Sequence, residues 1–220
     1  MNMSEFVGMN AGSLASDVDD HVLLKEMSHR INNEYACAIN AVCLRASKSP
    51  NAELRTALAD VATLLMQFAD IHRALTFPVG GRPIEVGSYL QRLCRVLSST
   101  RLRDRNIRLL LVESGPQLLS AENGWKLGLA VSELVTNSCR HAFGASGGDI
   151  RIDLEKDGAT LKCCVRDNGK QQGNRPPGQG LKLMRSLVQS AGGTLDYHFG
   201  RCGATTLISM PNSEALRGIY

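Results

Sequence analysis

The feature that most constrains this 220-residue chain is a regular apolar seam between Asn51 and about Thr76. The seam residues recur at alternating intervals of four and three, with one histidine among them: Leu54, Leu58, Val61, Leu65, Phe68, His72 and Leu75. This heptad spacing predicts a helix whose apolar stripe packs against other helices. The segment therefore calls for a helical partner, either elsewhere in the chain or in a second copy.

A second apolar stripe precedes it, from Asp20 to about Ser47, at the spacing of an amphipathic helix: Leu24, Met27, Ile31, Tyr35, Ala38 and Val42. Pro50 stands between the two stripes and predicts a tight turn. Residues 20–77 are thus predicted to form a helical hairpin. Because one hairpin leaves apolar surface in water, we expect two copies to pair as a dimeric four-helix bundle, so the protein is predicted to be a homodimer.

Residues 78–83 contain two prolines and two glycines and are predicted to link two domains. Beyond them, helical patterns at about 84–99, 122–143 and 181–191 alternate with strand-like runs at 107–112, 150–154, 161–165, 194–199 and 204–210. Turn signals at 156–159 and 200–203 predict antiparallel pairing of the neighbouring strands. Residues 84–211 are therefore predicted to form an α+β domain, with helices on one face of a mixed or antiparallel sheet.

The two ends and the composition narrow the class of protein. Residues 1–19 lack periodicity and are expected to be a flexible lead-in too short for a sensing domain. Any signal is therefore expected to come from elsewhere, and a separate sensor or input protein is a candidate partner. Residues 212–220 are expected to be a tail. The charge of +4 is spread along the chain, which argues against nucleic acid as a partner. Seven cysteines without a CxxC pair predict reduced thiols. No apolar run reaches the ~18 residues of a membrane span, so we expect a cytoplasmic protein without membrane insertion.

One predicted helix carries a distinct polar face. Glu133, Asn137 and His141 recur every four residues with Arg140 beside them, and the opposite side is apolar. A carboxylate and an amide one turn apart suit Mg²⁺, while a guanidinium and an imidazole suit phosphate oxygens. Polar residues at this spacing equally suit an ordinary solvated face, so this stretch alone leaves both readings open.

Two glycine-containing segments follow in order. Asp167-Asn168-Gly169 ends a predicted strand with an acid able to accept the exocyclic amine of adenine. Gly178-Gln179-Gly180-Leu181 opens the last predicted helix, where backbone N–H groups suit a phosphate. Each segment alone is common, but the polar helix face and both segments in this order, at strand-to-loop and loop-to-helix boundaries, favour a nucleotide site.

In these three segments the chain resembles the GHKL (Bergerat) ATP-binding fold of gyrase, Hsp90, histidine kinases and MutL proteins, an α/β sandwich. The resemblance covers residues 84–211 and implies ATP and Mg²⁺ as cofactors. It assigns them eight residues: Glu133, Asn137, Arg140, His141, Asp167, Gly169, Gly178 and Gly180. By this resemblance Glu133 and Asn137 hold the metal, Asp167 reads adenine, and the basic pair contacts phosphates. The three glycines flank the ATP lid.

The chain departs from that family at the lid. Gln171 stands where the first glycine box has its second glycine. Eight residues separate Gly169 from Gly178, which predicts a short lid.

The first helix carries a second resemblance. Leu24 through Asn33 is similar to the phosphoacceptor box of two-component sensor histidine kinases with a His-Arg-x-x-Asn signature. His29 lies about 200° around the helix from both Met27 and Ile31, so it faces away from the apolar stripe. An exposed neutral imidazole can attack a γ-phosphoryl group. Asn33, one turn on, can orient that group or a hydrolytic water.

The neighbours of His29 differ from those of many histidine kinases. Arg30 replaces the acidic residue that assists the nucleophile, and an arginine cannot act as a base. Glu26, three residues before His29, is the candidate substitute. The catalytic set inferred from this resemblance is therefore His29, Arg30, Asn33 and Glu26.

Three functions are compatible with these sequence features. The favoured one is a histidine kinase that phosphorylates His29 from Mg-ATP and passes the group to a response-regulator receiver domain in a phosphorelay. The second is a histidine phosphotransfer protein of the same architecture that does not use ATP, which the short lid and Gln171 encourage. The third is an anti-sigma-type serine kinase or another ATPase, which gives no reason for the hairpin.

Overall fold

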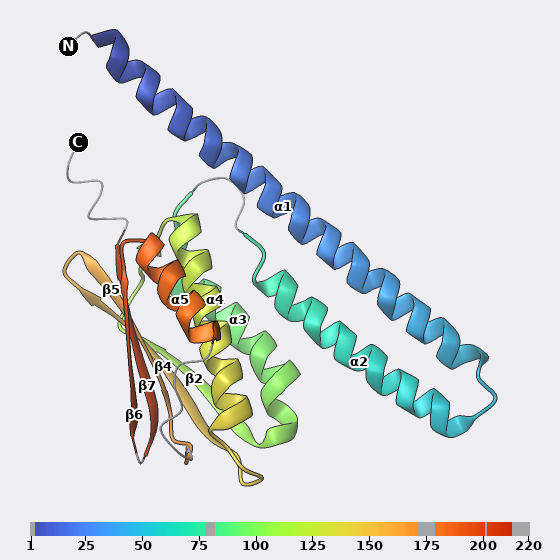
Figure 1. Ribbon diagram of the computed structural model, residues 1–220. Coiled ribbons are helices and arrows are strands. Elements are labelled where there is room, and N and C mark those ends of the chain that lie inside the picture. Colours follow the sequence, from blue (N-terminus) through green and yellow to red (C-terminus); the bar gives the residue numbers. More distant parts are fainter. Residues whose placement is uncertain (1–2, 78–81, 171–178, 201, 213–220) are drawn as a thin grey trace. The chain divides into compact units, whose positions relative to one another are not determined.

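The computed structural model describes residues 3–77, 82–170, 179–200 and 202–212, with side chains from Val22 onward in the first helix (Figure 1). The chain divides into two compact units, Met1–Phe77 and Pro78–Tyr220. The first is helical and the second combines helices with strands.

The first unit is an antiparallel pair of helices, α1 (Met3–Lys48) and α2 (Ala52–Ala74). Asn51 caps α2, because its side-chain oxygen accepts the backbone N–H groups of Glu53 at 2.8 Å and Leu54 at 3.2 Å. Arg55 closes the turn by donating to the carbonyl oxygens of Ser49 and Pro50 at 3.1 and 3.2 Å. The predicted hairpin and its turn at Pro50 are confirmed.

The sequence placed the start of the first helix at Asp20, after a flexible lead-in over residues 1–19, whereas α1 begins at Met3. That stretch contains no proline. Once one helical turn exists, further residues join it at little cost, since nucleation is the expensive step. The helix therefore extends to residues before Asp20, although these residues carry no apolar stripe.

The second unit contains every strand that the sequence predicted. In chain order its elements are β1 (Ile84–Glu85), α3 (Val86–Leu97), the π-helical turn η1 (Ser98–Leu102), the 3₁₀ turn η2 (Arg103–Arg105), β2 (Ile107–Glu113), β3 (Leu118–Leu119), α4 (Ala121–His141), β4 (Gly148–Asp157), β5 (Thr160–Asp167), α5 (Gln179–Ser190), β6 (Thr194–Gly200) and β7 (Gly203–Pro211). The antiparallel pair β1 and β3 and the two turns after α3 were not predicted. They are too short to leave a periodic pattern.

The five long strands form one mixed sheet in the order β2-β4-β5-β7-β6. β2 pairs with β4 in parallel, and the other pairs are antiparallel. Helices α3, α4 and α5 lie on one face of this sheet (Figure 1). The expected α+β domain with helices on a single face of the sheet is confirmed, and the sheet is mixed and not purely antiparallel.

The core lies between that face and the three helices. Alternate residues of β4 and β5 point into it and are nearly inaccessible to solvent: Ile150, Ile152, Leu154, Leu161, Cys163 and Val165. The helices contribute a second buried set: Leu90, Leu93, Leu97, Leu127, Val131, Val135, Met184 and Val188. This burial accounts for the period-2 pattern of the strands and the 3.6-residue pattern of the helices. Across the part of the chain that the structure describes, no helix has the length and apolar character to cross a membrane.

Replacing Ile152 with alanine should lower the free energy of unfolding by about 2–5 kcal/mol, because a fully buried side chain is removed and a cavity remains. Leu110→Ala on the edge strand is the matched control. Leu110 is 53% exposed, so its loss should change stability by less than about 0.5 kcal/mol. Urea unfolding followed by circular dichroism gives both values, and equal losses would contradict the assignment of the core.

Candidate functional site

Helix α4 presents the polar face that the sequence predicted. Glu133 and Asn137 are half-buried, and Arg140 and His141 are exposed. The opposite side of the helix is buried in the core, as expected. Ser120 caps α4 by accepting the N–H of Asn123 at 3.1 Å. Packing therefore fixes the rotation of α4 about its axis, and with it the direction of the polar face.

A second guanidinium lies near this face. Arg101, in the π-helical turn η1, is held against α4 where the Cys139 thiol approaches the Arg101 carbonyl oxygen at 3.4 Å. Burial and the charge of Arg140 lower the pKa of Arg101, whereas the carboxylate of Glu133 acts in the opposite direction. Two like charges brought together beside a carboxylate are characteristic of sites that bind an anion or an anion with its metal.

Asp167 lies where three elements meet. It is buried at the end of β5. One oxygen, Oδ1, accepts the N–H groups of Gly169 at 3.1 Å and of Ala204 in β7 at 3.2 Å. The other, Oδ2, accepts the hydroxyl of Ser138 in α4 at 2.7 Å. The carboxylate is therefore held in one orientation from three sides.

Asn168 holds the turn after β5. Its side-chain oxygen accepts the N–H of Asp149 at 2.8 Å, and its side-chain nitrogen donates to the Asp149 carboxylate at 3.1 Å. Arg108 pairs with the same carboxylate at 2.6 Å. The Asp-Asn-Gly segment is thus pinned to β4, which explains why a short polar residue follows Asp167.

Two of the three predicted glycines allow close approaches to α4. A Cβ atom on Gly169 would lie 2.3 Å from the carbonyl oxygen of Ala142, just after α4 ends. A Cβ atom on Gly180, at the start of α5, would lie 2.4 Å from Oε1 of Glu133. The third predicted glycine, Gly178, and the departure at Gln171 lie outside the described residues.

These residues fit an adenine nucleotide. A buried carboxylate with acceptor capacity remaining suits the exocyclic amine of adenine. The polar face of α4 offers an acid and an amide for Mg²⁺ together with cationic groups for phosphates. The start of α5 lies close to Glu133 because Gly180 has no side chain, and backbone N–H groups at the start of a helix suit a phosphate.

The predicted phosphoacceptor residues lie on the helical hairpin. His29 and Asn33 are exposed on α1, as the helical geometry predicted. Glu26 and Arg30 form an ion pair with 3.1 Å between Oε1 and Nε, and both remain largely in solvent. His72, on the seam of α2, contacts the ring of Tyr35 with 5.6 Å between centroids.

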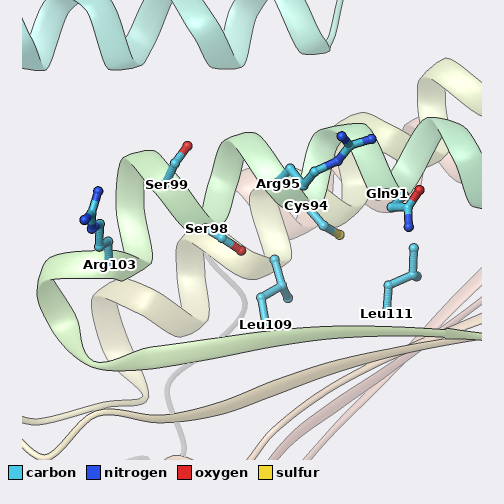
Figure 2. Close-up of a pocket in the computed structure, with 8 residues that line it drawn as sticks. All are labelled: Gln91, Cys94, Arg95, Ser98, Ser99, Arg103, Leu109 and Leu111. Carbon is cyan, nitrogen blue, oxygen red and sulfur yellow. The ribbon is translucent and has the colours of Figure 1, made fainter.

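The second unit also has an open cavity of about 520 Å³ between α3 and β2 (Figure 2). Leu109 and Leu111 point from the strand toward the helix, and Cys94 and Ser98 point back toward the strand (Figure 2). Of the predicted site residues that the structure describes, none lines this cavity. It is therefore separate from the polar face of α4.

Sequence reasoning missed three contributors to the site. Ser138 follows Asn137 on the buried side of α4, and a polar residue at a core position was the signal available. Gly203 has φ of +119°, and a Cβ there would lie 1.9 Å from the carbonyl oxygen of Asp167. Arg101 is one of four arginines between 101 and 108, and only the fold distinguishes it from the others.

Two family models match adjacent parts of the chain. Residues 26–101 match the family described as "Histidine kinase", and residues 104–208 match the "Histidine kinase-like ATPase domain". The first range contains His29 and the second contains Glu133 and Asp167. Together the two ranges cover most of the chain.

The relatives are sensor histidine kinases. The chain is 27% identical over 174 residues to the sensor histidine kinase PdtaS of Mycobacterium tuberculosis. The matched region covers 76% of this chain and 34% of that protein. It therefore spans about a third of that relative's length.

Among solved structures, the fold is similar to the histidine kinase domain of the Erythrobacter litoralis EL346 blue-light activated histidine kinase. The TM-score is 0.58 at 19% identity, covering 89% of this chain and 95% of that one. Full-length ShkA in complex with AMPPNP is similar with a TM-score of 0.54 at 18% identity, covering 86% of this chain and 46% of that one.

Gly169→Ala should lower the free energy of unfolding by about 1–3 kcal/mol, because its methyl group would meet the backbone oxygen of Ala142. Gly144→Ala is the matched control, since its Cβ would have no atom within 4 Å. That variant should unfold at the same or a slightly higher denaturant concentration. Urea unfolding of both variants tests the close approach, and an unaffected Gly169→Ala would refute it.

Proposed function

Because this chain belongs to the two-component histidine kinases, we propose that it phosphorylates its own His29 from Mg-ATP and passes the phosphoryl group to an aspartate of a response-regulator receiver domain. The observation that carries the proposal is the pairing of a buried acid, Asp167, with the polar face of α4 in one domain. Such a pairing supplies an acceptor for adenine and a face for a metal with a triphosphate.

Each predicted nucleotide-site residue of the second unit has its own role in this proposal. Asp167 accepts a hydrogen bond from the adenine amine. Glu133 and Asn137 would hold Mg²⁺, which would offset the negative charge of the phosphates. Arg140 and His141 offset phosphate charge from the exposed end of the face. ATP supplies the γ-phosphoryl group when bound.

The transfer step needs an unhindered nucleophile. The imidazole of His29 is exposed on α1 and faces away from the apolar stripe. One of its nitrogens forms a bond to the γ-phosphorus while the bond between that phosphorus and the bridging oxygen of ADP breaks, so ADP leaves with the electron pair. The phosphoryl group then moves to a carboxylate oxygen of the receiver domain, which restores His29.

The ion pair beside His29 suggests how its neighbours contribute. Arg30 holds the carboxylate of Glu26 in place one turn along α1. Glu26 can then accept the proton of the attacking imidazole, and Arg30 acts by positioning it. Asn33 orients the phosphoryl group or a hydrolytic water from the same face.

The hairpin supports the proposed homodimer. Leu58 and Leu65 are partly covered within the hairpin, whereas Leu54 and Val61 of the same seam remain 49% and 46% exposed, and Leu64 beside them is 49% exposed. Apolar residues gathered along one helix in this way are characteristic of an interface. A second hairpin packed on this strip would complete a four-helix bundle.

His29→Ala should abolish transfer of label from γ-labelled ATP to the protein while leaving folding and ATP binding unchanged, because the side chain makes no core contact. The label on the wild type should be lost in acid and retained in base, as expected of phosphohistidine. Phosphopeptide mapping should place it between Glu26 and Asn33. Asn33→Ala is the companion variant, which should keep the label but change how quickly it is lost.

Undiminished label in His29→Ala would overturn this mechanism. A wild type that binds no ATP but accepts a phosphoryl group on His29 from a phosphorylated response regulator would establish the phosphotransfer function instead.

Val61→Glu should convert the dimer to a monomer, because pairing would bury a carboxylate without a partner at a cost of several kcal/mol. Thr63→Glu adds the same charge elsewhere on α2, at another exposed position, and should leave the dimer intact. Multi-angle light scattering at micromolar concentration distinguishes the two. A wild type that is already monomeric there would contradict the proposed assembly.

A further inference from the structure

One hydrogen bond joins the helix with the polar face to the acid at the end of β5. The hydroxyl of Ser138 donates to Oδ2 of Asp167 at 2.7 Å. Ser138 is 8% exposed and Asp167 is 7% exposed, so water does not compete freely for either group. The bond links residues 29 positions apart in the chain.

The carboxylate of Asp167 has a limited number of acceptor positions for a ligand. An ionised carboxylate has about four acceptor positions, two on each oxygen. Both positions on Oδ1 of Asp167 are taken, by the N–H groups of Gly169 and Ala204. Ser138 takes one of the two on Oδ2. Among the residues that the structure describes, one acceptor position is therefore left open, and it is on Oδ2.

The same bond commits the only donor of Ser138. A serine hydroxyl has a single hydrogen, and here it points to Asp167. A base that presents an amine beside Oδ2 finds an acceptor. A base that presents a carbonyl oxygen there meets no hydrogen-bond donor, because the Asp167 carboxylate only accepts and the Ser138 hydroxyl already donates to it. The carbonyl oxygen and Oδ2 would then be two acceptors facing each other in a buried place.

We propose that Ser138 is a specificity-determining residue that, by holding Asp167 as a fixed acceptor with one open position, makes the site select an aminopurine over an oxopurine. This rests on the proposed function, since it concerns the base of the nucleotide bound there. Ser138 acts through Asp167 and is in that sense a positioning residue. Without its hydroxyl, Oδ2 loses a neighbour and the carboxylate is held from the Oδ1 side alone.

The test compares two nucleotides that differ at this position of the base. ADP carries an amine where inosine diphosphate carries a carbonyl. Isothermal titration calorimetry on the full chain with Mg²⁺ gives the dissociation constant of each. The wild type should bind ADP more tightly, and Ser138→Ala should reduce the ratio of the two constants about tenfold, the effect of losing one buried hydrogen bond to a charged group.

Two variants separate this role from packing. Ser138→Thr keeps the hydroxyl and should keep the wild-type ratio. Ser132→Ala removes another serine that is 8% exposed on the same helix and should also keep the ratio. If Ser138→Ala does not fold, Ser138→Cys replaces it, because a thiol is a weak donor of similar size.

The outcomes are distinguishable from failure of the proposed function. An unchanged ratio in Ser138→Ala, or a ratio lost equally in Ser138→Thr, overturns the selectivity role while leaving nucleotide binding in place. A wild type that binds neither nucleotide overturns the kinase proposal and this inference together.

Discussion

The burial of the apolar side of α4 against the mixed sheet is the constraint on which the rest of the second unit depends. Leu127, Val131 and Val135 have no exposed surface, so the helix cannot rotate without exposing them at a cost of roughly 1.5–3 kcal/mol each. This packing sets the direction of the polar residues on the other side of the helix. A site built in this way keeps its direction before any ligand arrives, which lowers the cost of binding.

Asp167 connects helix α4 to the sheet. Its carboxylate accepts hydrogen bonds from α4, from the turn after β5 and from the start of β7. Glycines at 169 and 203 are required because side chains there would meet backbone atoms of Ala142 and Asp167. The acid proposed to read adenine is thus also a structural junction, so substitutions at Asp167 should be judged by stability and by binding together.

The first unit follows a different rule. Part of the apolar seam on α2 is exposed to solvent. On the other helix, α1, the side chain of His29 is also exposed. The two kinds of exposure have opposite physical meanings. Exposed apolar residues in a row favour a partner surface, whereas an exposed imidazole flanked by an ion pair favours chemistry with a soluble group. Substitutions on the α2 seam and at His29 can therefore test the proposed pairing and the proposed phosphoryl transfer separately.

The sequence by itself determined the hairpin, the five long strands, the polar face of α4 and the exposure of His29, because each follows from local periodicity or spacing. It did not determine the helix upstream of Asp20, where no stripe marks a helix that simply continues. Only the tertiary structure decided which side chains complete the site. Ser138 contacts Asp167 across 29 residues, and the π-helical turn sets Arg101 near Arg140. Contacts between distant segments depend on how elements pack, and no spacing within one element encodes them.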